Sequence, residues 1–185
     1  MRERLAAAVL AAAVGLGTAS AAADQTDKRL APLFAELKTT ADHDAGQRLT
    51  SRIWELWFET GNEAARAVLA EGDQAMHVGD YDTALAAFTK LVGLAPKFAE
   101  AWNRRATVRY VMGDLDGSVA DIERTLALEP RHFGALSGLG LIYLRLGNEE
   151  AALKAFKRAF AINPQLGDLK ANIELIEKRL KDKAI

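Results

Sequence analysis

The sequence of 185 residues contains no cysteine and only four prolines. Without cysteine the chain has no disulfide, no zinc–thiolate site and no cysteine nucleophile. It also lacks an excess of charge of either sign, since 24 basic and 25 acidic residues give a formal net charge of -1. Nucleic-acid binding usually needs a strongly basic face, so we expect no nucleic-acid partner.

Motifs that would indicate catalysis are absent from the sequence as well. It has no nucleophile elbow, no phosphate-binding glycine loop and no H-E-x-x-H pair of zinc ligands. The segment Asp42-His43-Asp44 could be a metal site, but we favour a polar turn between helices. The other histidines, His77 and His132, are far away in the sequence, and His132 is expected in a loop. We therefore expect a protein that is not an enzyme and needs no cofactor and no metal ion.

The first 23 residues have the layout of a secretory signal peptide. Arg2 and Arg4 form a basic start, residues 5–16 carry no charge, and small residues lead to three alanines before Asp24. A membrane-spanning helix needs about 20 strongly apolar residues, which this alanine-rich stretch does not provide. We expect cleavage near Ala23/Asp24, export, and no stable membrane anchor afterwards; an uncleaved anchor and a cytosolic helix are the alternatives.

The main positive feature is an internal repeat, in which the same residue types recur at a constant spacing along the sequence. Three glycines, each followed by Asp or Asn, and three prolines recur at this interval: Gly79, Gly113, Gly147, Pro96, Pro130 and Pro164. Between each glycine and the following proline, apolar residues recur with the period of a helix. Glycine stops a helix and proline marks the exit from one, so each unit is predicted to contain two helices.

The repeat resembles the tetratricopeptide repeat family, in which each unit of about 34 residues folds into two antiparallel helices. The third unit matches the family signature best, and the matching residues are Leu136, Leu139, Gly140, Tyr143, Ala152, Phe156, Ala159 and Pro164. The first unit keeps Gly72 and Pro96, and the second keeps Trp102 and Pro130. The resemblance implies an all-α solenoid with three units within residues 62–166, at about 65–98, 99–132 and 133–166.

The segments on either side of the repeats are predicted to be helical. Residues 167–185 have one apolar face, as a C-terminal capping helix needs, and residues 24–61 are predicted to form a helical hairpin stacked on the array. The apolar side chains of the second hairpin helix span about 200°, which is wider than one contact needs. We expect that helix to touch both the first hairpin helix and the first helix of repeat one. Exposure of Trp54 and Phe58 would instead indicate an external partner.

Several residues within the repeats have predicted structural roles. Gly72 and Gly140 are small enough for the two helices of a unit to approach closely, and Trp102 fills space beside such a position. In the second unit, Arg105 is predicted to pair with Asp121 on the facing helix, which would offset the cost of partly burying the guanidinium. An anion clamp made with Arg109 is the alternative.

The resemblance also implies a concave groove, lined by the first helix of each unit, that holds an extended peptide or a partner helix. The candidate partner-binding residues are Asp73, Met76, His77, Asn103, Arg104, Thr107, Tyr110, Ser137, Leu141, Leu144 and Arg145. Asn103 suits a peptide backbone and Arg104 suits a carboxylate. The small residues Gly134, Ser137 and Gly138 leave room over the third unit. A solvated polar face is the alternative interpretation.

The carboxylate clamp known in this family is not matched, because Leu69, Asp73 and Gly138 stand where it needs Lys, Asn and Arg. Chaperone C-terminal tails are therefore not the expected ligands. The chain is similar to small exported proteins of this family in the periplasm of Gram-negative bacteria, which implies a non-enzymatic adaptor that binds a protein or peptide of the cell envelope. One alternative is a permanent subunit or assembly factor that uses the convex face and the ends. An enzyme or small-ligand binder would need a deep, enclosed pocket.

Overall fold

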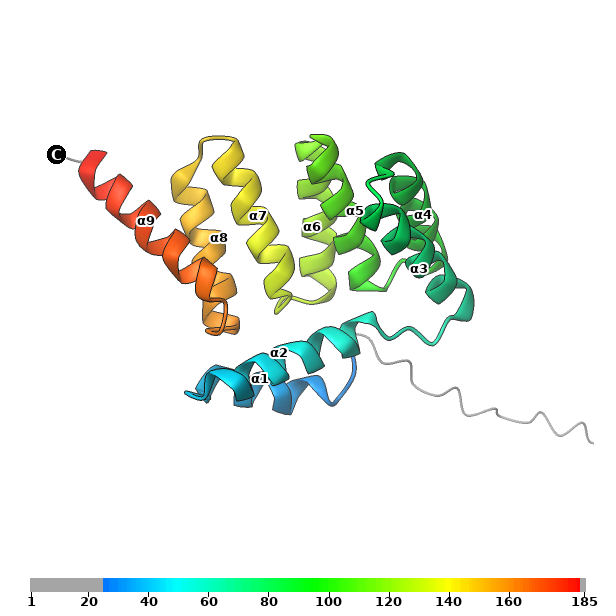
Figure 1. Ribbon diagram of the computed structural model, residues 1–185, viewed down its shortest axis with the longest axis horizontal. Coiled ribbons are helices and arrows are strands. Elements are labelled where there is room, and N and C mark those ends of the chain that lie inside the picture. The colour runs from blue at the N-terminus through cyan, green and yellow to red at the C-terminus, as the bar shows by residue number, and fades with distance from the viewer. Residues whose placement is uncertain (1–24, 184–185) are drawn as a thin grey trace, which may run out of the picture.

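The computed structural model describes residues 25–183, and this part of the chain consists of helices joined by short turns (Figure 1). Its nine helices are α1 (Leu30–Thr39), α2 (His43–Phe58), α3 (Glu63–His77), α4 (Tyr81–Leu94), α5 (Ala99–Met112), α6 (Leu115–Leu128), α7 (Phe133–Arg145), α8 (Glu149–Ile162) and α9 (Gly167–Lys183). Helices α3 to α8 form three hairpins, which confirms the predicted all-α repeat architecture. The expected signal peptide and its cleavage site lie outside the described residues.

The evenly spaced glycines end the first helix of each hairpin. Gly79, Gly113 and Gly147 have φ angles of 77°, 87° and 74°, in the left-handed region that glycine adopts without steric cost. The Asp or Asn that follows each glycine accepts a hydrogen bond from a backbone N–H of the next helix. This side-chain cap starts the second helix of each hairpin at a fixed residue.

Close approach of the two helices within a hairpin depends on glycine at two positions. A Cβ atom on Gly72 would lie 2.4 Å from the ring of Phe88, and one on Gly140 would lie 2.2 Å from the ring of Phe156. Both phenylalanine side chains are fully buried. The predicted structural role of these two glycines is therefore present, because a side chain at either position would push the facing helix away.

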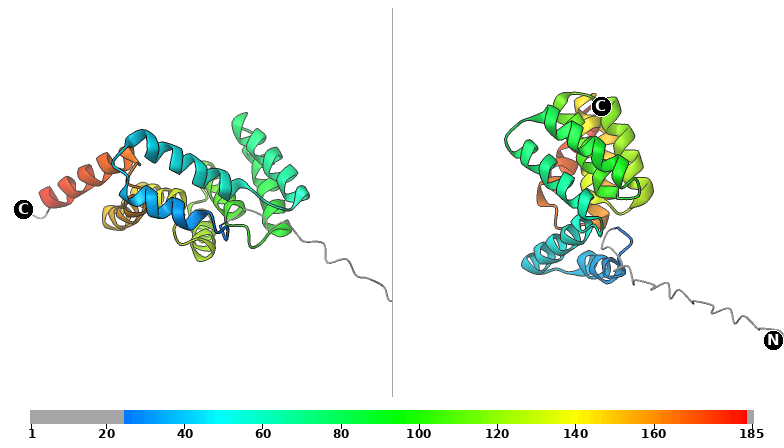
Figure 2. Two further views of the ribbon diagram at one scale, coloured as in Figure 1. Left: turned by 90° about the horizontal axis from the view of Figure 1, so that it is seen from below. Right: turned by 90° about the vertical axis from the view of Figure 1, so that its right-hand side faces the viewer.

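The N-terminal hairpin of α1 and α2, here called the strap, does not stack on the end of the first repeat as predicted. It runs along one edge of the array, beside the turns that join successive hairpins (Figures 1 and 2). Gln25, which precedes the strap, hydrogen-bonds with the backbone of Lys97 and Ala99. Near the other end, Asn163 Nδ2 donates to Thr50 Oγ1 of α2. The strap thus connects to the array at turns before the second repeat and after the third.

The composition of the first repeat explains why its outer face needs no cover. Helix α3 exposes Ala64, Ala67 and Ala70 next to Glu63 and Arg66, so the face turned to solvent is small and charged. The wide apolar arc of α2 is buried elsewhere, in a core cluster that α1 and α2 share with α7, α8 and α9. Burial of apolar area is non-directional, so the strap lies where the larger apolar surface is.

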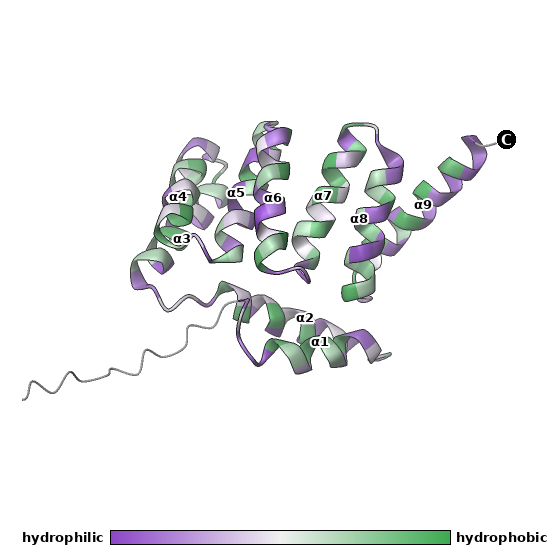
Figure 3. Ribbon diagram, turned by 180° about the vertical axis from the view of Figure 1, so that it is seen from behind, coloured by the Kyte–Doolittle hydropathy of each residue, from purple (hydrophilic) through white to green (hydrophobic). Residues whose placement is uncertain are grey.

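Helix α9 covers the other end of the array. Its residues Leu169 and Ile176 are buried in the shared core, whereas Lys170, Glu174 and Glu177 are exposed. Figure 3 shows hydrophobic and hydrophilic residues alternating along this helix. One apolar face against the last hairpin and one charged face toward water are what the end of a solenoid needs.

Candidate functional site

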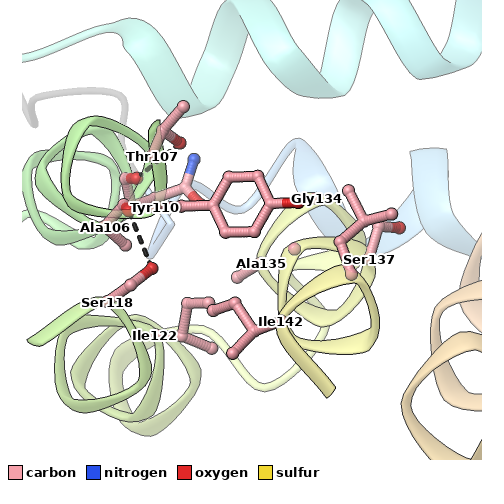
Figure 4. Close-up of a pocket in the computed structure, with 12 residues that line it drawn as sticks. Ala106, Thr107, Tyr110, Ser118, Ile122, Gly134, Ala135, Ser137 and Ile142 are labelled. Carbon is pink, nitrogen blue, oxygen red and sulfur yellow. Dashed lines mark hydrogen bonds between the residues drawn. The ribbon is translucent and has the colours of Figure 1, made fainter. Parts of the chain in front are cut away.

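A pocket of about 230 Å³ lies between the second and third repeats, where α5, α6 and α7 meet (Figure 4). We call it the repeat 2/3 pocket. Apart from Ser118, its buried lining is apolar and comprises Ala106, Ile122, Ala135 and Ile142. Its partly exposed rim comprises Asn103, Thr107, Tyr110, Ser137 and Leu141. All five rim residues belong to the predicted partner-binding set, so the structure brings this part of the prediction together in one place.

The pocket exists because α7 carries small residues where it faces α5. A Cβ atom on Gly138 would meet only Ile122 Cδ1, at 3.7 Å, which is an ordinary van der Waals distance. The space in front of Gly138 is therefore open, as the sequence predicted. A larger side chain at this position would enter the pocket without striking the backbone of a neighbouring helix.

The serine and threonine hydroxyls around the pocket donate their hydrogens to the chain itself. Ser118 Oγ donates to the carbonyl of Ala106 at 2.7 Å (Figure 4). Ser137 Oγ donates to a carbonyl one turn earlier at 2.8 Å, and Thr107 Oγ1 does the same at 3.0 Å. A hydroxyl has one hydrogen to donate, so these groups present only lone pairs to anything in the pocket.

A second cavity, of about 340 Å³, continues from the repeat 2/3 pocket toward the strap. The two share Asn103, Thr107 and Gly134 in their lining, so they form one groove, and the wall contributed by the strap consists of Trp54 and Phe58. These two rings stack with their centroids 5.6 Å apart. Both side chains are half-buried. They are neither fully buried nor largely exposed. The predicted partner-binding set did not include them, because that set was taken from the repeats and these two residues lie outside the repeats.

The approach of the strap depends on Gly134 at the start of α7. A Cβ atom at this position would lie 2.6 Å from Trp54 Cη2. The room that the sequence predicted over Gly134 therefore exists, but the indole of Trp54 occupies it. The apolar arc of α2, wider than one contact surface needs, was the signal in the sequence that this helix had a further contact.

A buried hydrogen-bonded network connects the strap, α5 and α7. The carboxylate of Glu100 is 1% exposed and lies 3.0 Å from His132 Nε2. Ala135 N–H donates to His132 Nδ1, so the ring proton is on Nε2 and points to Glu100. The imidazole stacks on Trp57 at a centroid distance of 4.3 Å. His132 is thus the buried N-cap of α7 and a contact of the strap, and not the simple loop residue that the sequence predicted.

Arg104 is already neutralised by carboxylates of the chain. Its Nε lies 3.0 Å from Glu100 Oε1, its Nη1 lies 3.5 Å from Asp73 Oδ1, and its guanidinium sits over the Phe58 ring at 4.6 Å. Burial raises the pKa of Asp73, and the nearby Arg104 only partly opposes this. The geometry therefore gives Arg104 two carboxylates of the protein as ionic partners, and its predicted role in binding a ligand carboxylate stays a prediction.

The predicted ion pair between Arg105 and Asp121 is present, on the side of α5 that faces α6. Arg105 Nε and Nη2 donate to the two oxygens of Asp121 at 2.8 and 2.7 Å. Arg109 adds a third hydrogen bond to the same carboxylate at 2.9 Å. Because Asp121 is 2% exposed and bonded to both guanidiniums, this cluster is a structural network and not a free anion clamp.

The remaining candidate residues lie outside the two cavities. Met76 packs against the core of the first two repeats, His77 is exposed at the end of α3, and Leu144 packs against the core shared with the strap. Arg145 donates to the carbonyl of Tyr110 at 3.1 Å, at the end of the groove far from the strap. The structure therefore centres the groove on the second and third repeats.

The segment Asp42-His43-Asp44 begins α2. Asp42 accepts hydrogen bonds from the backbone N–H groups of Asp44 and Ala45, as a helix N-cap does. Within residues 25–183, no three His, Asp or Glu side chains are grouped as metal ligands. No helix in the same range is long and apolar enough to cross a membrane.

Comparisons with known proteins agree with this architecture. The family model described as "Tetratricopeptide repeat" matches residues 69–116 and 103–167. A TPR repeat-containing protein of Rhizobium etli is 34% identical over 92 residues, which cover 50% of this chain and 45% of that protein. The match therefore spans less than half the length of that relative.

Solved structures share the fold. The first TPR domain of Spaghetti (RPAP3), bound to an HSP90 peptide, is similar with a TM-score of 0.60 and 21% identity, over 63% of this chain and 93% of that chain. MamA is similar with a TM-score of 0.60 and 22% identity, over 84% of each chain. At these identities the likeness concerns the fold alone.

Proposed function

We propose that this chain, which belongs to the tetratricopeptide repeat family, is a non-enzymatic interaction module that binds a segment of a partner protein. The fold is typical of scaffolds that bind proteins and peptides, and one structural neighbour was solved with a peptide bound. The observation that carries the proposal is the continuous groove between α2, α5 and α7, where five predicted partner-binding residues meet an aromatic wall from the strap.

The test is affinity capture with a variant that fills the groove. Gly138→Leu places a side chain in the repeat 2/3 pocket, since a Cβ there meets only Ile122 at 3.7 Å. Gly93→Leu is the matched control, because Gly93 is an exposed glycine of α4 where an added Cβ would have nothing within 4 Å. We expect a partner from the cell-envelope fraction to be retained by wild type and Gly93→Leu and lost by Gly138→Leu. If all three proteins retain the same partners, the groove is not the binding site.

We also propose that the protein acts in the bacterial periplasm, as an adaptor of the cell envelope. This rests on the signal-peptide layout of the first 23 residues and on the absence of cysteine, which suits an oxidising compartment because nothing can mispair. Expression of the whole gene with fractionation, followed by intact mass measurement, tests it. A mature protein in the periplasmic fraction that begins at or near Asp24 supports the proposal, and an uncut chain in the cytosol contradicts it.

A second candidate function, a permanent subunit of a larger envelope complex, is favoured by one observation. Val78, Met112 and Leu146 recur at the repeat interval, at the ends of the first helices, and their exposed fractions are 65%, 43% and 56%. Exposed apolar surface of this kind is found at protein interfaces. Replacing all three with serine should abolish capture of the partner if this edge is the interface, and should leave it intact if the groove is.

A further inference from the structure

The chemistry of the groove indicates which kind of segment it accepts. Apart from Ser118, the buried lining of the repeat 2/3 pocket consists of two isoleucines and two alanines. Its volume of about 230 Å³ exceeds the roughly 150 Å³ of an engineered apolar cavity that binds benzene. The pocket therefore has room for one leucine or phenylalanine side chain and offers that side chain an apolar surface.

A charged or hydrogen-bonding side chain would gain little from the polar groups of this pocket. The hydroxyls of Ser118, Ser137 and Thr107 all donate to backbone carbonyls of the protein, and the phenol of Tyr110 belongs to the rim. A polar group buried without a partner is destabilising. The anchor side chain of a ligand is thus expected to be apolar.

The charges near the groove are compensated within the protein. Glu100 is engaged by Arg104 and His132, and Arg104 also faces Asp73 and covers the Phe58 ring. An acidic segment would compete with these carboxylates for Arg104. A basic segment would find Asp73 outside the lining of the two cavities, with its charge already balanced by Arg104. Among the described residues, neither sign of charge therefore meets an uncompensated opposite charge at the centre of the groove.

The groove can nevertheless hold an extended backbone. Asn103 Nδ2 lies 3.2 and 3.1 Å from the two oxygens of Glu100, which fixes the orientation of the amide on the groove side. Its Oδ1 can then accept an N–H from a ligand backbone. On the strap side, the stacked rings of Trp54 and Phe58 provide an apolar wall.

We propose that the groove binds an extended, uncharged segment of a partner protein, and that one leucine- or phenylalanine-sized side chain of this segment enters the repeat 2/3 pocket. This inference rests on the proposed function and defines the chemistry of its ligand. It separates this groove from one that recognises an acidic tail, since Arg104, the only arginine among the described residues that line it, is already paired with two carboxylates.

The experiment is selection of random linear peptides displayed on phage against purified wild-type protein. Enriched peptides are synthesised, and their binding to wild type, Gly138→Leu and Gly93→Leu is measured by fluorescence anisotropy. We expect enriched peptides to lack charge around one large apolar residue and to bind Gly93→Leu as they bind wild type. Replacing the apolar residue with alanine, or using Gly138→Leu, should weaken binding by about tenfold or more, as expected for burial of one such side chain.

The outcomes separate the inference from the function on which it rests. Enriched peptides that need acidic or basic residues, and that still lose binding with Gly138→Leu, would overturn the ligand chemistry and leave the groove as the binding site. Apolar peptides that bind Gly138→Leu and wild type equally would show that the pocket is not the anchor site. Absence of any peptide whose binding depends on the groove would contradict both proposals. Circular dichroism melting of both glycine variants excludes misfolding as the cause of lost binding.

Discussion

Replacement of Glu100 by alanine tests whether the buried network holds the strap to the repeats. Glu100 accepts the Nε2 proton of His132, which is fully buried. Without this acceptor the imidazole keeps an unpaired buried donor, which costs about 1–3 kcal/mol. Since His132 stacks on Trp57, the loss acts directly on the contact between strap and array.

Arg104 adds a second part to the expected loss. It keeps Asp73 as a partner at 3.5 Å, and its side chain is 29% exposed, so solvent reduces the penalty to about 1–2 kcal/mol. Together the two parts lower the free energy of unfolding by about 2–5 kcal/mol. For a chain of this size that corresponds to a fall in Tm of about 10 °C.

The assay is urea unfolding of each protein in a Trp102→Phe background, so that tryptophan fluorescence reports only on Trp54 and Trp57 of the strap, whereas circular dichroism reports on all helices. The control is Glu123→Ala, which removes the same side chain from an exposed position on α6 and should change the free energy by no more than about 0.5 kcal/mol. The reasoning is refuted if Glu100→Ala destabilises the protein no more than Glu123→Ala. If fluorescence changes before circular dichroism, the strap detaches first.

Three further predictions concern the repeats and the groove. Gly140→Ala should lower the free energy of unfolding by about 1–2 kcal/mol, because its Cβ would overlap a buried ring. Gly93→Ala should raise the free energy of unfolding by about 0.5–1 kcal/mol. Thermal melts in which both variants shift Tm in the same direction would contradict this. Asp121→Ala should lower the free energy of unfolding by about 3–5 kcal/mol, because it leaves two arginines without their carboxylate. The double variant that also carries Arg105→Leu should be destabilised less. Urea unfolding of both variants measures the difference. Asp73→Asn should stabilise the fold at neutral pH, because burial raises the pKa of Asp73 and the stability that the protonated carboxyl provides is lost as pH rises through that pKa. The difference in stability between Asp73→Asn and wild type should fade in acid, where the carboxyl of wild type is protonated. A difference that grows in acid would contradict the direction of the pKa shift.

The strap changes how the groove of this protein is built. In the repeats alone, the groove is open on the edge where the inter-repeat turns lie. Here Trp54 and Phe58 stand at that edge and form one wall, and Gly134 allows Trp54 to approach α7. A segment bound between α5 and α7 would therefore touch the strap as well, which links partner binding to the position of the strap.

The sequence determined the repeats, because each hairpin is specified by residues close together in the chain. Gly72 and Phe88 lie in one unit, as do Gly140 and Phe156, and the glycines with positive φ recur at the predicted interval. The ion pair of Arg105 with Asp121 was predictable for the same reason. The polar rim of the groove followed from the repeat register.

Only the tertiary structure decided where the strap lies and what Arg104 does. The apolar arc of α2 showed that this helix had to be covered on two sides, but the free energy of apolar burial does not depend on which surface provides the cover. Trp54 contacts Gly134, which lies in a distant part of the chain, and no periodicity of either segment specifies that pair. Of the two carboxylates that neutralise Arg104, Glu100 lies one turn away on the same helix, α5. Asp73 comes from α3, and its approach is set by the packing of one repeat on the next.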